Sequence, residues 1–131
     1  MKIAVLTAVL LNASIPNSPP ARTGDCKWVH GRFAIYNGSG VRRIWLIGTH
    51  RIIAIYDEDD KIPPAIARYQ SNATDYRGFD DALYGEFYVC ALEPSRPGWM
   101  QHVRIVRTRK LIFRGKPYFA KGSWGPVRDV R

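Results

Sequence analysis

The chain has 131 residues and a mass of 14.9 kDa, which is the size of one domain. Apolar residues make up 46% of it and charged residues 24%, and this balance excludes a disordered, collagen-like or coiled-coil chain. The formal net charge is +9, and residues 96–131 carry all of it, because they contain ten Lys or Arg and a single acid, Asp129. Such an asymmetric basic chain favours an anionic partner.

A positively charged start precedes nine mostly aliphatic residues at 3–11. This arrangement is typical of a secretory signal, and the apolar stretch is too short for a membrane-spanning helix. Three prolines follow, in the window 13–21 where cleavage is expected. The sequence therefore predicts a signal peptide over residues 1–21 and one exported domain over residues 22–131, periplasmic or secreted and without a transmembrane segment. The alternative is that residues 3–11 form a buried first strand.

The only two cysteines are Cys26 and Cys90. In an oxidising compartment an even pair is most simply a disulfide, and in the chain-entropy model a loop this long makes it worth about 4 kcal/mol. The alternatives are two free buried thiols or a redox pair, although a redox pair normally has C-x-x-C spacing. Three scattered histidines do not supply a zinc site. We expect a structural disulfide, no metal and no cofactor.

The first half of the domain predicts three strands, at residues 27–36, 41–47 and 51–56, because apolar and polar residues alternate there and β-branched and aromatic residues are frequent. The Asn-Gly-Ser-Gly run at 37–40 is a strong turn signal. Short connections predict a three-strand meander. On the first strand, one face carries Val29, Phe33 and Ile35, and the other carries Trp28, His30 and Arg32.

A long, partly acidic excursion occupies residues 57–85. It opens with four acids at 57–60 and then predicts a short helix over residues 65–69, with prolines in its first turn. Connections of this length are often functional. The acidic run has oxygen ligands for calcium but lacks the glycine and distal glutamate of an EF-hand loop, so a solvated loop is expected.

The second half predicts strands at residues 86–92 and 100–108, with 111–113 either a separate short strand or a continuation. The fold class is therefore mainly β: a small sandwich or barrel of about six strands, with one short helix in the excursion and one disulfide.

The three histidines, His30, His50 and His102, stand apart, and no H-E-x-x-H, G-x-S-x-G or P-loop motif occurs. We therefore expect a non-catalytic binding or structural domain that contacts envelope components or a partner protein. The alternative is a small secreted hydrolase, with a site built from the excursion at 57–85, His30 and His50.

Basic residues of the C-terminal segment alternate with aromatic ones, as in proteins that hold polyanions. In an extended strand Arg107 and Arg109 share a face, and Arg104 lies opposite unless a bulge intervenes. We expect an anionic lipid or glycan of the cell envelope as the partner, and no nucleic acid, because the chain is exported. The alternative is a solvated basic face. The candidate anion-binding residues are Arg104, Arg107, Arg109, Lys110, Arg114 and Lys116.

A series of short motifs is spaced along residues 26–106. They are Cys26, Val29-His30-Gly31-Arg32, Tyr36-Asn37-Gly38, Arg43-Ile44-Trp45, Gly48-Thr49 with Arg51, Gly85-Glu86-Phe87, Val89-Cys90 and Pro97-Gly98-Trp99-Met100-Gln101. This pattern resembles a group of small exported two-cysteine proteins of Gram-negative bacteria. The resemblance implies a bacterial, signal-bearing domain and no particular activity, and it does not extend to the basic segment beyond residue 107.

Overall fold

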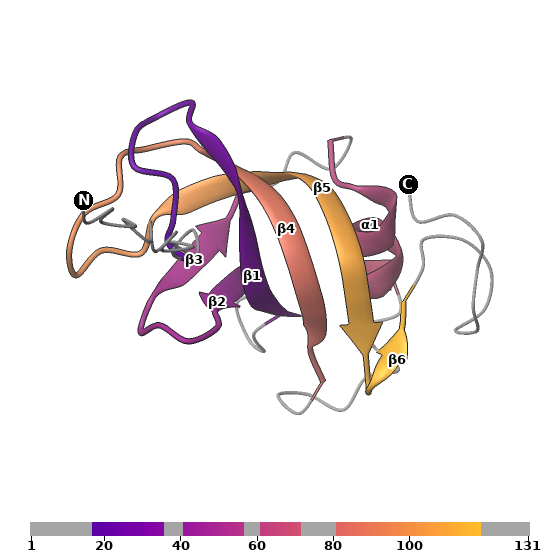
Figure 1. The fold of residues 1–131 in the computed structure, drawn as a ribbon. Helices are drawn as coiled ribbons and strands as arrows, with labels where there is room; N and C mark the ends of the chain where they lie inside the picture. Colours follow the sequence, from indigo (N-terminus) through magenta and orange to yellow (C-terminus); the bar gives the residue numbers. More distant parts are fainter. Residues whose placement is uncertain (1–16, 36–40, 57–60, 72–80, 119–131) are drawn as a thin grey trace, which may run out of the picture.

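A computed structural model describes residues 17–35, 41–56, 61–71 and 81–118 of the chain. These residues form one six-stranded sheet and one helix, so the predicted mainly β fold is confirmed (Figure 1). The elements in chain order are β1 (Cys26–Ile35), β2 (Arg42–Leu46), β3 (Ile52–Ile55), α1 (Pro64–Ser71), β4 (Leu83–Ala91), β5 (His102–Phe113) and β6 (Lys116–Pro117). Residues 111–113 continue β5. The apolar stretch at 3–11 and the acidic run at 57–60 lie outside the described residues.

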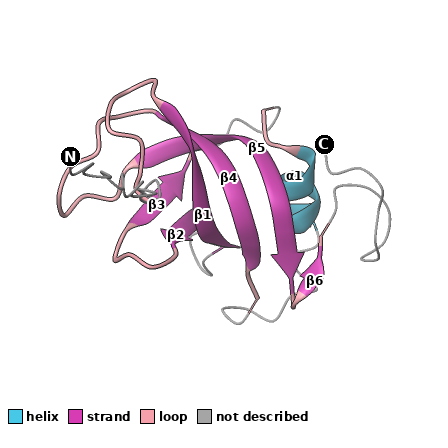
Figure 2. Cartoon of the chain, in the orientation of Figure 1, coloured by secondary structure: helices cyan, strands magenta, loops and turns pink. Residues whose placement is uncertain are grey.

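The strands follow the order β3-β2-β1-β4-β5-β6, and the predicted meander of β1, β2 and β3 is present. Its pairings are antiparallel, but β3 also pairs in parallel with β5 through Ala54–His102 and Ile55–Val103. This short pairing joins β3, at one edge of the sheet, to β5, which lies next to the other edge strand β6, so the sheet curls (Figure 2). The helix α1 lies in the connection between β3 and β4.

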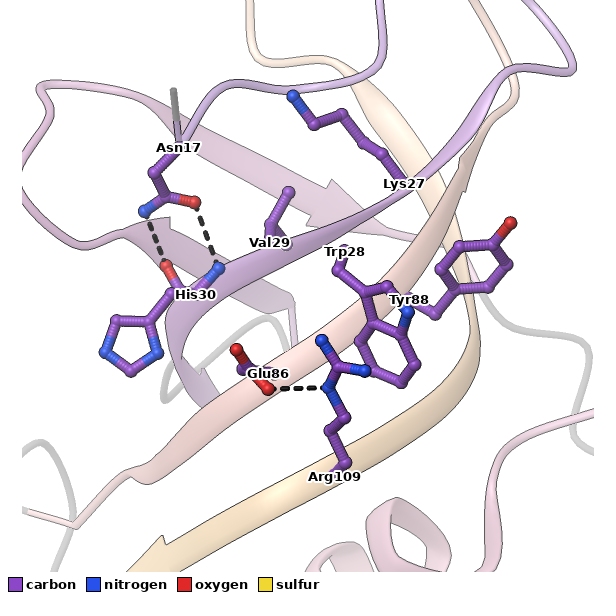
Figure 3. A pocket seen from close by; sticks show the side chains of 8 residues that line it. All are labelled: Asn17, Lys27, Trp28, Val29, His30, Glu86, Tyr88 and Arg109. Atoms are coloured by element: carbon purple, nitrogen blue, oxygen red, sulfur yellow. Dashed lines mark hydrogen bonds and ion pairs between the residues drawn. The ribbon is translucent and has the colours of Figure 1, made fainter. Parts of the chain in front are cut away.

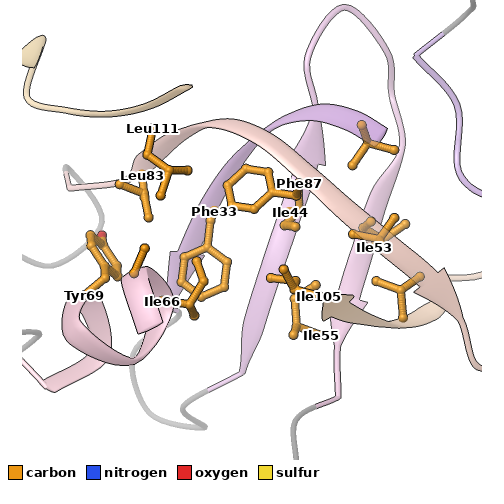
Figure 4. Packing of buried hydrophobic residues seen from close by; sticks show 14 of the residues in the cluster. Phe33, Ile44, Ile53, Ile55, Ile66, Tyr69, Leu83, Phe87, Ile105 and Leu111 are labelled. Atoms are coloured by element: carbon orange, nitrogen blue, oxygen red, sulfur yellow. The ribbon is translucent and has the colours of Figure 1, made fainter. Parts of the chain in front are cut away.

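The interior is filled by alternate residues of the strands, as the period of two in their sequences predicts. Val29 and Phe33 point inward from β1, whereas Trp28, His30 and Arg32 lie on the outer face. The helix α1 belongs to this interior, because Ala65, Ile66 and Tyr69 are buried in the same cluster (Figure 4). The described part of the excursion therefore has a structural role. Among the described residues, no helix is long and apolar enough to cross a membrane.

The predicted disulfide is also present and links Cys26 at the start of β1 to Cys90 near the end of β4. The two cysteines face each other in the β1–β4 register. Because their sequence separation is 64 positions, the bond joins the N-terminal edge of the domain to its second half.

Tyr69 provides a test of core packing through pH. Its ring meets Phe33 edge-to-face at a centroid distance of 5.7 Å and Phe113 at 5.8 Å. Burial, assisted by the nearby Asp81 carboxylate, raises the pKa of the Tyr69 hydroxyl from 10.0 to about 12. The folded state thus favours the neutral phenol, so this contribution to stability is complete below pH 10 and disappears as the pH rises towards about 12.

We expect the free energy of unfolding to fall by up to about 2–3 kcal/mol across this alkaline window, and Tyr69→Phe to remove that part of the fall. Urea titrations at a series of alkaline pH values measure it. The control is Tyr84→Phe, at an exposed tyrosine of β4, whose free energy of unfolding should fall with pH as steeply as that of the wild type. If the free energy of unfolding fell equally with pH in the wild type and in Tyr69→Phe, the fall could not be assigned to Tyr69.

Candidate anion-binding face

Three arginines of β5 lie on one outer face of the sheet. Arg104, Arg107 and Arg109 stand opposite Cys90, Tyr88 and Glu86 of β4, respectively. Arg104 joins the others because the register shifts between Tyr88 and Val89, which leaves Val106 as an extra residue in β5. A bulge of this kind changes the side to which the following residues point. The sequence placed Arg104 on the same face as Arg107 and Arg109 only if a bulge intervened, and this bulge is present.

Two of these arginines lie against aromatic rings. Trp28 of β1 and Tyr88 of β4 are neighbours across the sheet, with ring centroids 5.2 Å apart. The Cζ of Arg107 lies 4.9 Å from the centre of the Tyr88 ring, and that of Arg109 lies 3.9 Å from the centre of the Trp28 ring. We call these four residues the stacked cluster. Contact with a ring orients a planar guanidinium and leaves N–H donors at its edge for an anion.

Glu86 shares this face and neutralises part of its charge. The Nε of Arg109 donates a hydrogen bond to the Glu86 carboxylate at 2.6 Å (Figure 3). The Nζ of Lys110 lies 3.7 Å from the same carboxylate. The hydrogen bond from Arg109 holds the pKa of the Glu86 carboxyl below its ordinary value. Arg104 and Arg107, in contrast, have no carboxylate partner among the described residues.

A pocket of about 480 Å³ opens beside the stacked cluster and is closed on one side by the chain before β1 (Figure 3). Asn17 forms this wall: its Nδ2 donates to the carbonyl oxygens of His30 and Ile47, and its Oδ1 accepts from the amide of His30. Lys27 also lines the pocket, and its Nζ donates to the Ser18 hydroxyl at 2.9 Å. Residues 17–21, which the sequence assigns to the signal peptide, thus pack against the domain.

The other candidate cations lie elsewhere. Arg114, in the turn after β5, donates two hydrogen bonds to the carboxylate of Asp81, at 2.9 and 2.7 Å. Lys116 is exposed on β6. Sequence analysis predicted neither Trp28 nor Tyr88 as site residues. The alternation of polar and apolar residues in β1 indicated its polar face, but it gave no sign that β1 pairs with β4.

The histidines do not come together. His30 lines the pocket, whereas His50 is exposed in the turn between β2 and β3. The ring of His102 contacts the Glu93 carboxylate at 2.9 Å, and the pKa of Glu93 is held below its ordinary value by hydrogen bonds from the His102 ring and amide. Within the described ranges, no group of three His, Cys, Asp or Glu residues could hold a metal ion.

No family model, curated protein or solved structure matches this chain.

Proposed function

We propose that the protein is an exported, non-catalytic binding domain that takes an anionic glycan of the cell envelope on the outer face of β1, β4 and β5. The observation that carries the proposal is that Arg104 and Arg107, two cations without a carboxylate partner in the described chain, share one face of β5, where Arg107 lies over the Tyr88 ring. A disulfide supports export, because such bonds persist in oxidising compartments.

The arrangement of the cations favours a linear, repeating anion. In a strand, alternate residues are about 7 Å apart, so β5 presents a row of positive charges along its length. Guanidinium groups bind phosphate, sulfate and carboxylate through paired N–H donors, and Arg107 is already oriented by the Tyr88 ring. Less conformational entropy is then lost when the anion binds.

Acid–base catalysis fits the same pocket less well. His30 and Glu86 both line it, but Glu86 is hydrogen-bonded to Arg109 and has a lowered pKa. A carboxyl that serves as a general acid near neutral pH needs a raised pKa instead. Glu86 therefore remains ionised and acts here as the partner of Arg109.

The binding proposal is tested with deacylated lipopolysaccharide, a phosphorylated carbohydrate without acyl chains, and with neutral dextran. We expect weak, salt-sensitive binding to the first by calorimetry or immobilised-ligand assays, and none to the second. The variant Arg104→Ser/Arg107→Ser should weaken binding about tenfold or more, because it removes both guanidinium groups that have no carboxylate partner among the described residues.

The matched control is Arg22→Ser/Lys116→Ser, which removes two exposed charges outside this face and lowers the net charge equally. Equal losses in both variants would show a general charge effect and contradict a built site. Binding that survives high salt and the Arg104/Arg107 substitutions would also contradict it.

A further inference from the structure

A second surface, on other residues of the sheet, is apolar. Trp45 of β2 stands opposite Ile52 of β3. In the parallel pairing of β3 with β5, Ala54 faces His102 and its amide donates to the carbonyl oxygen of Gln101, so Met100 lies in the segment that leads into β5 alongside β3. The exposed fractions of Trp45, Ile52 and Met100 are 38%, 37% and 36%. We call these three residues the apolar row.

Trp99 precedes Met100 and is the most exposed large apolar residue of the described chain, at 69%. The segment that carries it is held in place. The guanidinium of Arg51 donates to the Ser95 hydroxyl at 2.6 Å and to the carbonyl oxygen of Arg96 at 3.3 Å. The side-chain Nε2 of Gln101 donates to the carbonyl oxygens of Glu93 and Pro20. Trp99 is thus presented on a braced loop, which costs little further ordering on binding.

The two tryptophans differ from Trp28 in a way that points to an apolar environment. Two guanidinium groups lie over Trp28, whereas in the described part of the chain no aromatic ring pairs with Trp45 or Trp99 and no guanidinium lies over either ring. The Nε1 of Trp45 donates to the Thr49 carbonyl oxygen at 2.8 Å. Because this donor is already satisfied, the exposed part of the ring can enter hydrocarbon without leaving a polar group unpaired.

The charges beside the apolar row are positive. Arg51 bonds only to neutral oxygens, Arg96 is exposed, and neither has a carboxylate partner among the described residues. The nearby Glu93 is paired with His102. Apolar side chains with aromatic residues and adjacent cations are the pattern with which proteins hold the surface of an anionic bilayer.

We propose that the apolar row and Trp99 dock the protein on an anionic phospholipid bilayer, with Trp99 and Met100 entering the interface and Arg51 and Arg96 facing the lipid phosphates. This surface shares no residue with the stacked cluster, and the proposal does not depend on the ligand of that cluster.

The test is co-sedimentation with vesicles of phosphatidylethanolamine and phosphatidylglycerol, compared with vesicles of phosphatidylcholine. We expect the wild type to prefer the anionic vesicles, and Trp99→Ser/Met100→Ser to lower the partition coefficient about tenfold or more. Quenching of tryptophan fluorescence by brominated lipid should fall in the same variant. Arg96→Ser should cause a smaller loss, which high salt removes.

The matched control is Val106→Ser/Ile112→Ser, which removes two similarly exposed apolar side chains of β5 and should bind as the wild type does. Circular dichroism and thermal unfolding confirm that each variant is folded. Equal losses in both apolar variants, or no loss in Trp99→Ser/Met100→Ser, would overturn the proposal. Vesicle binding that is lost only in Arg104→Ser/Arg107→Ser would overturn it too, and would assign the lipid headgroup to the glycan face.

Discussion

Replacing both Cys26 and Cys90 by Ser is expected to lower the free energy of unfolding by about 4 kcal/mol, because the crosslink closes a loop of 64 residues and restricts the unfolded chain. This loop runs from β1 to β4 and includes β2, β3 and α1, so most of the core lies within it. A loss of this size is a large part of the stability of an ordinary domain of about 5–15 kcal/mol. Urea titrations of the wild type and the double variant give the difference directly.

The control for the crosslink is the reducing agent. Reductant should destabilise the wild type to the level of the double variant and leave the variant unchanged. Thiol titration of the denatured, unreduced protein should detect no free thiol. Two titratable thiols, or a urea midpoint of the wild type that does not change with reductant, would refute the stabilisation assigned to the disulfide.

Arg114→Ser is expected to lower the free energy of unfolding by about 2–3 kcal/mol, because Asp81 is only 8% exposed and would lose both of its hydrogen bonds from that guanidinium. This loss of stability is smaller than that expected for breaking a fully buried ion pair, because the Arg114 side chain is half exposed. Arg114 is therefore a structural residue and is left intact in the binding experiments.

A double-mutant cycle separates this pair from its surroundings. Asp81→Asn/Arg114→Ser should be less destabilised than Arg114→Ser alone, because the buried carboxylate has been removed. Lys116→Ser, two residues away and exposed, is the control and should change stability by no more than about 0.5 kcal/mol. Additive effects of the two substitutions would show that the pair contributes nothing beyond its separate residues.

Local sequence determined the secondary structure of this protein well. The strands at 27–36, 41–47 and 51–56, the short helix after the prolines and the strand that carries Cys90 all lie close to their expected positions. The reason is that a period of two in apolar residues depends on neighbouring residues only. The disulfide was also predictable, because the chain offers a single pair of cysteines.

Tertiary structure decided which of these elements meet and which side chains share a face. The bulge at Val106 places Arg104 beside Arg107, and the pairing of β1 with β4 brings Trp28 to Tyr88. The fold also brings Asn17 against β1, where it hydrogen-bonds to the backbone of His30. None of this is encoded in a local period, because strand register is set by partners that lie far apart in sequence, and one residue added to a strand reverses the side to which the following residues point.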